Sequence, residues 1–192
     1  MTRPQVNDDV IVRTRFVSPT LRPHVIHRPR VDAALERVVE HPLTVVRAEA
    51  GYGKTTAIVS WLGTTGRRHV WYNLGDIEPD PQVFLLHLLE ALGAVLPGID
   101  VAGRERLQQG ERGPRLWGAV VDRLSNDLLD QLDADLVLVL DDYDGVNRPE
   151  INAVVERLVE TMPPKLHLVV TTRTMPSLRA RARWRASSEL LE

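Results

Sequence analysis

Residues 43–56 read LTVVRAEAGYGKTT, and this stretch decides which fold the chain can adopt. Its first five residues form a short apolar, β-branched run that follows Pro42, which predicts a buried strand. A glycine-rich turn comes next, and a helix is expected from Lys54 to Leu62, ending at Gly63. A strand, a glycine turn and a helix that begins with Lys and Thr form an arrangement able to hold phosphate groups.

The glycine turn has the residues that a phosphate-binding P-loop needs. Gly51 and Gly53 let the backbone N–H groups turn inward, Lys54 can reach the β- and γ-phosphates, and the hydroxyl of Thr55 can ligate Mg²⁺. Ala48 stands where the pattern G-x-x-x-x-G-K-[ST] has its first Gly, and a small residue suffices there if its φ is negative. A plain glycine turn is the alternative. The predicted nucleotide contacts are Ala50, Gly51, Tyr52, Gly53, Lys54, Thr55 and Thr56.

Two acids follow the most apolar run of the chain, residues 136–140 (LVLVL). A carboxylate at the tip of such a strand binds Mg²⁺ in P-loop proteins, and a second acid can orient the attacking water. We therefore expect Asp141 to hold the metal, and Asp142 to activate water or to sense the γ-phosphate. The alternative is a surface turn that begins with two acids and continues through Asp144 and Gly145.

A third polar group closes the expected site. The apolar run at residues 166–172 predicts another buried strand, and Arg173 follows it at the carboxyl edge of the sheet, where ligands of such folds bind. The guanidinium of Arg173 can distinguish ATP from ADP through charge-assisted hydrogen bonds to the γ-phosphate. A solvated Arg at a strand end is the alternative.

The remaining pattern alternates strands and helices, which predicts an α/β fold with a mainly parallel sheet between two helical layers. Asp80 is expected to cap the helix at residues 80–96, with Pro81 in its first turn. Residues 1–30 are expected to form an extended arm on the core, and the polar stretch 100–114 a mobile loop. The other expected elements are helices at residues 31–40, 114–132 and 149–162, and a strand at residues 69–74.

Composition limits the classes of function. The 192 residues suffice for one well-cored domain, and a formal net charge of −2 gives no overall attraction to nucleic acid or membrane. There is no Cys, the six His residues show no metal-ligand spacing, and the N-terminus has no apolar signal core. We therefore expect a cytoplasmic protein with no metal other than Mg²⁺ bound with nucleotide, and no membrane contact.

Several motifs together resemble one family, the signal-transduction ATPases with numerous domains (STAND). Within it, the chain is similar to the ATPase part of large ATP-binding LuxR-type and maltose-activator-type transcriptional regulators. The loop A-x-A-G-Y-G-K-T-T, with Ala in place of the first Gly and Tyr between the two glycines, resembles the family's own version of the Walker A motif. The other anchors span about residues 14–178: Arg28-Pro29-Arg30, Trp71-Tyr72-Asn73-Leu74 with Asp80-Pro81 and Phe84, Leu140-Asp141-Asp142-Tyr143, and Thr172-Arg173 with Pro176.

The resemblance implies an ATP/ADP switch with a sheet of the ASCE type, in which the sensor strand lies between the Walker A and Walker B strands. It implies that Arg28 and Pro29 close over the adenine, and that ATP-bound chains self-associate and act on transcription. The expected division is an arm at 1–30, the NTPase domain at 31–178 and a basic tail at 179–192. We expect the chain to be a piece of a longer regulator whose other segments bind DNA and sense the inducer.

Two other functions remain open. A small P-loop kinase or phosphotransferase needs an arginine-bearing lid, for which residues 104–115 are the candidate. A non-catalytic nucleotide-binding interaction module is the other. Slow ATP hydrolysis is expected, because no arginine finger can be assigned, and its absence commonly costs about 10³ to 10⁵ in rate. ATP is preferred over GTP only by resemblance.

The tail also has two readings. Four arginines and Trp184 lie between residues 179 and 185, and they can touch nucleic acid, but an exposed helix or frayed end is the favoured interpretation.

Overall fold

The structure, a computed structural model, describes residues 11–21, 28–99, 101–186 and 190–191. Within these residues one five-stranded sheet has the order β2-β3-β4-β1-β5, and every pair is parallel. This confirms the predicted α/β class, and β4 lies between β1 and β3 as expected for the sensor strand. The strands are β1 (Leu43–Arg47), β2 (His69–Asn73), β3 (Leu136–Asp141), β4 (Leu166–Thr172) and β5 (Leu190–Leu191).

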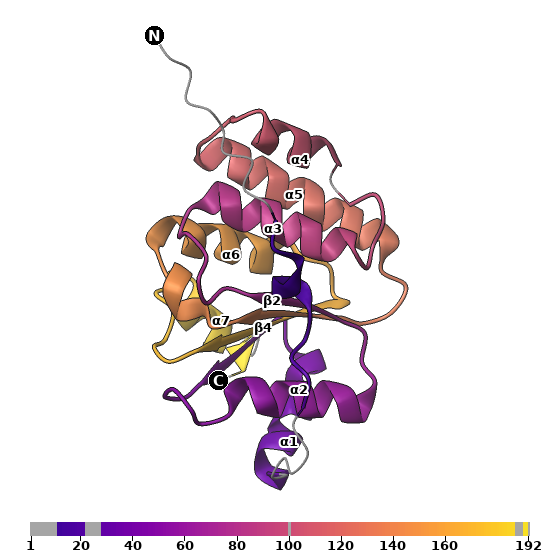
Figure 1. Cartoon of the computed structure of the whole chain (residues 1–192), viewed down its shortest axis with the longest axis vertical. Coiled ribbons are helices and arrows are strands. Elements are labelled where there is room, and N and C mark those ends of the chain that lie inside the picture. Colours follow the sequence, from indigo (N-terminus) through magenta and orange to yellow (C-terminus); the bar gives the residue numbers. More distant parts are fainter. Residues whose placement is uncertain (1–10, 22–27, 100, 187–189, 192) are drawn as a thin grey trace.

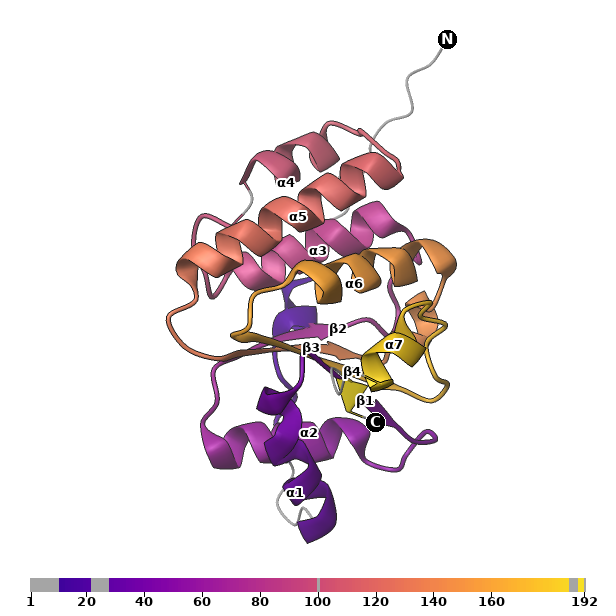
Figure 2. The ribbon, with the colours of Figure 1, turned by 180° about the vertical axis from the view of Figure 1, so that it is seen from behind.

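Helices cover both faces of the sheet, so the molecule has three layers (Figures 1 and 2). On one face lie α1 and α2, and on the other lie α3 and α6, with α5 and then α4 further from the sheet. The helices are α1 (Pro29–Glu36), α2 (Lys54–Thr65), α3 (Pro81–Gly93), α4 (Val101–Gln108), α5 (Pro114–Gln131), α6 (Pro149–Thr161) and α7 (Arg181–Ala186), and the 3-10 turns are η1 (Arg13–Phe16), η2 (Arg37–Glu40) and η3 (Tyr143–Val146).

The period of two along each strand divides the core between the two faces. In β3, Leu138 and Leu140 join the core under α3, α5 and α6, whereas Val137 and Val139 join the smaller core under α1 and α2. All residues of β3 and β4 are buried. A strand buried on both faces is apolar at nearly every position, which is why these runs were recognisable in the sequence.

Helix starts were predicted better than helix ends. Asp80 caps α3 as expected, because its Oδ1 accepts from the N–H groups of Gln82 at 2.7 Å and Val83 at 3.2 Å. The predicted end of α2 at Gly63 is wrong, since the helix continues to Thr65 and Gly66 then takes a φ of 64°. A glycine inside a helix costs only about 1 kcal/mol relative to Ala, so it need not end one.

The stretch expected to be a mobile loop, residues 100–114, contains a helix. Residues 101–108 form α4, which docks through the buried Leu107 and through Gln82 Nε2, which donates to the Leu107 carbonyl at 2.6 Å. Arg104 adds an ion pair to Glu90 and a hydrogen bond to the Leu89 carbonyl at 2.9 Å. The expectation was wrong because tertiary contacts, not local apolar periodicity, stabilise this helix.

At the N-terminal end, the described residues 11–21 lie along the β2 edge of the sheet. Phe16 packs edge-on against Tyr72 and His87, with ring centroids 5.7 and 6.0 Å apart. Ser18 Oγ lies 2.8 Å from His69 Nε2 and forms a hydrogen bond to the same edge. This segment is not simply extended, since it includes the η1 turn, and the rest of the predicted arm before Arg28 lies outside the described residues.

At the C-terminal end, Trp184 on α7 is only 1% exposed and belongs to the larger core. The reading of this segment as an exposed helix or frayed end is therefore wrong for Trp184. A short fifth strand, β5, pairs Leu190 with Leu43 and Leu191 with Thr44 at the β1 edge of the sheet. The domain boundary at 178/179 remains a prediction.

Within the described residues, no helix has the length and apolar character needed to cross a membrane.

Candidate nucleotide-binding site

The loop between β1 and α2 has the backbone conformation that phosphate binding requires. Gly51 has a φ of 81° and Gly53 a φ of 77°, values that side chains disfavour, and Gly53 caps the N-terminus of α2. Asp142 is the only non-glycine residue with positive φ in the part of the chain that the structure describes. Ala48 therefore takes a conformation open to any L-residue, which explains how it replaces the first Gly of the motif.

Lys54 begins α2 and folds back beneath the loop. Its Nζ donates to the carbonyls of Ala48 at 2.6 Å and Glu49 at 3.2 Å. An ammonium group has three donors, so these two bonds leave one for an anion. Lys54 therefore lies at the positive end of α2, where the helix dipole and the ammonium could act together on one anion.

Asp141 ends β3 and meets hydroxyl groups from two other elements. Thr55 Oγ1 on α2 lies 3.0 and 3.1 Å from its two carboxylate oxygens, and Thr171 Oγ1 on β4 donates to Oδ1 at 2.6 Å. Burial raises the pKa of Asp141 above its ordinary value, and the two hydroxyl donors only partly offset that effect. The carboxylate is thus buried with neutral donors, a setting that a cation would stabilise.

The second acid has an unusual backbone. Asp142 has φ 59° and ψ 53°, the left-handed conformation, and its N–H donates to Thr171 Oγ1 at 2.9 Å. Its carboxylate lies 3.8 Å from the Arg173 guanidinium, and both side chains are about half exposed. The left-handed turn costs conformational energy and persists here because Thr171 fixes it.

These groups line one pocket of about 380 Å³ at the carboxyl edge of the sheet. Most of the residues predicted from the sequence meet there: Ala50, Gly51, Gly53, Lys54, Thr55, Thr56, Asp141, Asp142 and Arg173. Asn73 and Thr171 also line it and were not assigned a role beforehand.

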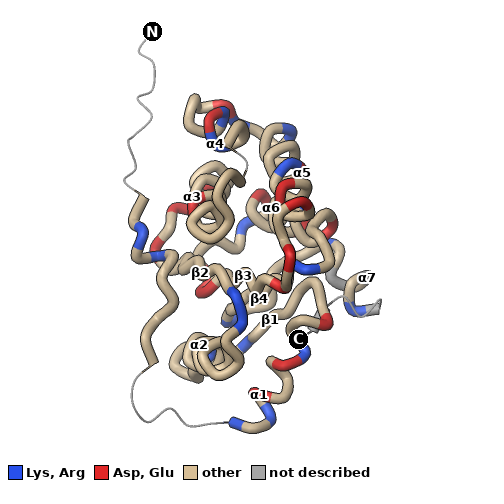
Figure 3. Tube along the Cα trace, turned by 90° about the vertical axis from the view of Figure 1, so that its right-hand side faces the viewer, with Lys and Arg blue, Asp and Glu red and all other residues tan. Residues whose placement is uncertain are grey.

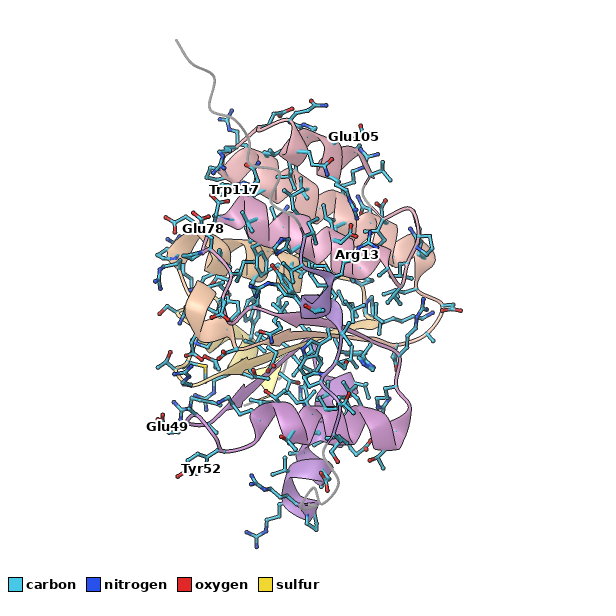
Figure 4. The ribbon with its side chains drawn as sticks, viewed as in Figure 1. Arg13, Glu49, Tyr52, Glu78, Glu105 and Trp117 are labelled. Atoms are coloured by element: carbon cyan, nitrogen blue, oxygen red, sulfur yellow. The ribbon has the colours of Figure 1, made fainter. Side chains whose placement is uncertain are left out.

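Three predicted contacts lie elsewhere. The Tyr52 side chain is 64% exposed, and Figure 4 shows Tyr52 and Glu49 at the outer tip of the loop. Arg28 precedes α1, and its Nη1 donates to the Tyr52 carbonyl at 3.0 Å. Pro29 is the first residue of α1. The structure thus places Arg28 on the outer backbone of the loop, next to the pocket and not among its lining residues.

Sequence reasoning missed Asn73, Thr171 and Asp144. Asn73 pairs in register with Asp141, and its Oδ1 accepts from the Gly75 N–H at 2.9 Å, which directs its amide toward the same strand edge. The available signal was position, since each of the three lies at or just after the carboxyl end of an apolar strand, where parallel strands present their ligands.

The candidate kinase lid is far from the pocket. Arg104 pairs with Glu90, Arg106 with Glu111, and Arg112 with the α3 cap Asp80. Figure 1 places α4 at the opposite end of the molecule from α2. No arginine of this segment, Arg115 included, is among the residues that line the pocket.

The site residues fit Mg²⁺ bound together with phosphate. The described residues contain no cluster of three or more His, Cys, Asp or Glu side chains able to hold a metal alone. Mg²⁺ requires no such cluster, because one or two protein oxygens plus phosphates and water complete its coordination. The Thr55 hydroxyl and the Asp141 carboxylate, within 3.1 Å of each other, supply those oxygens.

Charge on the outer surface has no single sign. Figure 3 shows Lys and Arg interspersed with Asp and Glu over α4, α5 and α6, in keeping with the formal net charge of −2.

The sheet order, the loop and the paired acids define a P-loop NTPase fold with its sensor strand between the loop strand and the acid strand. A chain in a solved structure of Drosophila ORC bound to AT-rich DNA and Cdc6 superposes with a TM-score of 0.51. It is 13% identical, and the match covers 84% of this chain and 55% of that one, so the likeness concerns the fold alone.

Curated relatives bear out the resemblance drawn from the motifs. The chain is 27% identical to the HTH-type transcriptional regulator MalT of Yersinia pestis (strain Pestoides F) over 183 residues. MalT of Yersinia enterocolitica is equally similar, and each match covers 95% of this chain. The chain spans about a fifth of the length of these relatives, 20% in each case. No model of a known protein family matches the sequence.

Proposed function

We propose that this chain is a nucleotide-switch domain that binds Mg-ATP and hydrolyses it slowly, as part of a transcriptional regulator of the MalT type. The observation that carries the proposal is the convergence of Lys54, Asp141 and Arg173 from three elements on one pocket. The similarity to MalT regulators along 95% of the chain supports the regulatory part.

The loop and α2 hold the phosphates. The N–H groups of the glycine turn and the start of α2 face the anion, and Lys54 donates its remaining N–H to the β- or γ-phosphate. A phosphate oxygen can also replace the weaker of the two carbonyl acceptors of Lys54, which is Glu49 at 3.2 Å. Backbone donors and an ammonium together bind a triphosphate without reading its base.

Thr55 and Asp141 hold the metal. Mg²⁺ held by these two residues would supply positive charge that offsets the charge of the phosphates. The cation also resolves the unfavourable burial of Asp141, whose pKa is raised by desolvation. Metal and protons therefore compete for this carboxylate, so lowering the pH should weaken metal binding.

Asp142 and Arg173 report on the γ-phosphate. Their 3.8 Å ion pair is half exposed, and such a pair is worth little, so a γ-phosphate can draw the guanidinium away from Asp142. Asp142, released from Arg173, is then able to accept a proton from an attacking water. ADP lacks the γ-phosphate, so Arg173 returns to Asp142.

Slow hydrolysis is expected because the pocket has few arginine side chains to stabilise the transition state of hydrolysis. Arg173 is the only arginine that lines the pocket among the described residues, and sensing occupies it. An arginine finger from another chain would raise the rate by about 10³ to 10⁵, so turnover by the isolated chain should stay below roughly 1 s⁻¹.

The remaining parts of the proposal come from the resemblance. They are the preference for ATP, the closure of Arg28 and Pro29 over the adenine, self-association in the ATP-bound state, and DNA binding by other segments of the regulator. The Arg28 bond to the Tyr52 carbonyl supports the closure, since it ties the start of α1 to the loop.

The test is calorimetric titration of the chain with ATP, ADP and GTP in Mg²⁺. Lys54→Ala should weaken ATP binding by at least 100-fold, because it removes the charge beside the phosphates. Lys165→Ala is a matched control, since Lys165 also donates to two backbone carbonyls, those of Leu132 at 3.2 Å and Asp133 at 2.7 Å, away from the pocket. Equal ATP affinity in wild type and Lys54→Ala would overturn the proposal.

A turnover assay separates the remaining alternatives. Phosphate release at about 1 s⁻¹ or faster by the isolated chain would contradict slow hydrolysis and exclude a non-catalytic module. Transfer of phosphate to an added acceptor pool would favour a kinase. We do not expect this result, because the candidate lid lies far from the pocket.

A further inference from the structure

Asp144 lies in η3, two residues beyond Asp142, and its carboxylate faces the turn that follows β4. We infer that Asp144 is a positioning residue that clamps the backbone of residues 172–174 and thereby aims Arg173 at the nucleotide. This inference rests on the proposed function, in which Arg173 senses the γ-phosphate.

The clamp uses both carboxylate oxygens. Oδ2 accepts from the Arg173 N–H at 2.7 Å, and Oδ1 accepts from the Thr174 N–H and the Thr174 hydroxyl, each at 3.1 Å. The Thr172 hydroxyl also lies 3.1 Å from Oδ1, but its single hydrogen has a closer acceptor in the Thr174 carbonyl at 2.6 Å. Three donors from two successive residues therefore converge on one side chain.

This carboxylate is suited to permanent clamping. Burial alone would raise the pKa of Asp144, but donation by the N–H groups of Arg173 and Thr174 and by the Thr174 hydroxyl lowers it below its ordinary value. The group is therefore ionised throughout the neutral range. Hydrogen bonds from backbone N–H groups to a carboxylate are about twice as strong as neutral ones.

Asp142 and Asp144 divide the control of Arg173 between them. Asp142 lines the pocket and pairs with the guanidinium at 3.8 Å, so it contacts the part that moves. Asp144 does not line the pocket, and it bonds to the backbone N–H of Arg173, the part that must stay fixed. A half-exposed arginine side chain has many rotamers, and a fixed backbone limits where its guanidinium can reach.

The ratio of the ADP to the ATP dissociation constant separates positioning from mere support of the fold. Loss of a structural turn would lower stability and weaken both nucleotides together. Loss of a positioning residue acts through Arg173 and weakens ATP alone, because only ATP has the γ-phosphate.

The experiment compares Asp144→Asn with Arg173→Ala by calorimetry in Mg²⁺. Asn keeps one carbonyl acceptor but turns an amide N–H toward an N–H donor of the turn, so the clamp opens at one side. Asp144→Asn should lower the ADP-to-ATP ratio at least tenfold, which is about 1.4 kcal/mol, with ADP affinity changed less than threefold. The matched control is Asp122→Asn, which breaks an ion pair with Arg157 between α5 and α6 and should leave the ratio unchanged.

The double variant tests whether Asp144 acts through Arg173. Arg173→Ala with Asp144→Asn should give the same ratio as Arg173→Ala alone, and a further decrease would overturn the inference. Should Asp144→Asn fail to fold, Thr174→Val removes one donor to the same carboxylate, and a smaller decrease of the ratio is expected. An unchanged ratio in both variants, with Arg173→Ala still lowering it, would refute the positioning role while leaving the proposed function standing.

Discussion

The hydroxyl of Thr171 links both acids of the site, and its removal gives the sharpest test of the geometry. Thr171 is 1% exposed, and its Oγ1 donates to Asp141 Oδ1 at 2.6 Å and accepts from the Asp142 N–H at 2.9 Å. Thr171→Val keeps the shape of the side chain but removes both bonds. A bond to a charged group contributes about 1.5–3 kcal/mol, and a donor left unsatisfied costs about 1–3 kcal/mol. Since the Asp142 N–H is only partly buried and such terms are not additive, we expect a loss of about 2–3 kcal/mol.

Thr44 provides a control of opposite sign within the same sheet. It is 3% exposed on β1, and its Oγ1 has no hydrogen-bond partner among the described residues. A buried hydroxyl without a partner costs about 1–3 kcal/mol in proteins, so Thr44→Val should stabilise the fold by about 1 kcal/mol. The same chemical change is therefore expected to act in opposite directions on adjacent strands.

Thermal and urea unfolding at pH 7 measure the difference. Because 1 kcal/mol shifts the midpoint by about 2–4 °C in a chain of this size, the two variants should differ by roughly 6–16 °C. Thr171→Val should also weaken Mg-ATP binding, since the lost donor further raises the pKa of Asp141. Equal shifts of the same sign in the two variants would refute the hydrogen-bond argument.

Two further predictions concern other buried groups. Asp141→Asn should raise the unfolding midpoint at pH 7 and weaken Mg-ATP binding. Because the pKa of Asp141 is raised in the folded state, its stabilising contribution is complete below about pH 4 and is lost as the pH rises through the folded pKa. The gain in stability from Asp141→Asn should therefore vanish in unfolding scans toward pH 4. A gain that persists at pH 4 would count against this cause. Trp184→Ala should lower the free energy of unfolding in urea by about 3 kcal/mol, because it empties a buried position. The control is Leu129→Ala on α5, where Leu129 is 61% exposed, and it should change stability by less than about 0.5 kcal/mol. Similar small losses in both variants would show that α7 contributes little to the core.

The parts of the fold that were predictable from the sequence are those whose physics is local. Residues 43–47, 136–140 and 166–172 are apolar runs because strands covered on both faces have no polar side, and the structure places strands at all three. The pocket followed from the same runs, since parallel strands end at one edge and bring their following residues together. Asp141 and Arg173, far apart in sequence, could thus be assigned to one site.

The features that escaped prediction depend on contacts between distant residues. The helix α4 has few buried residues of its own, and its stability comes from Leu107 and from Arg104 bonded to Glu90. Trp184 stands among arginines, so its neighbours in sequence indicated exposure while its neighbours in space are core residues. Asp144 looked like the continuation of a surface turn because its three donors come from residues about thirty positions further along the chain.

The end of β4 is the common neighbour of every part of the site. The N–H of Ala48, just after β1, donates to the Thr172 carbonyl at 3.2 Å. Thr171 bonds to Asp141 at the end of β3 and to Asp142, which follows it. A packed sheet does not deform gradually, so if Arg173 senses the γ-phosphate, we expect the response in the residues that follow Thr172. Those residues lead to Ala180, whose N–H donates to Glu156 on α6 at 3.1 Å, and then to the buried Trp184. The first helix after Arg173 is α7. If Arg173 senses the nucleotide, we therefore expect the docking of α7 to depend on which nucleotide is bound.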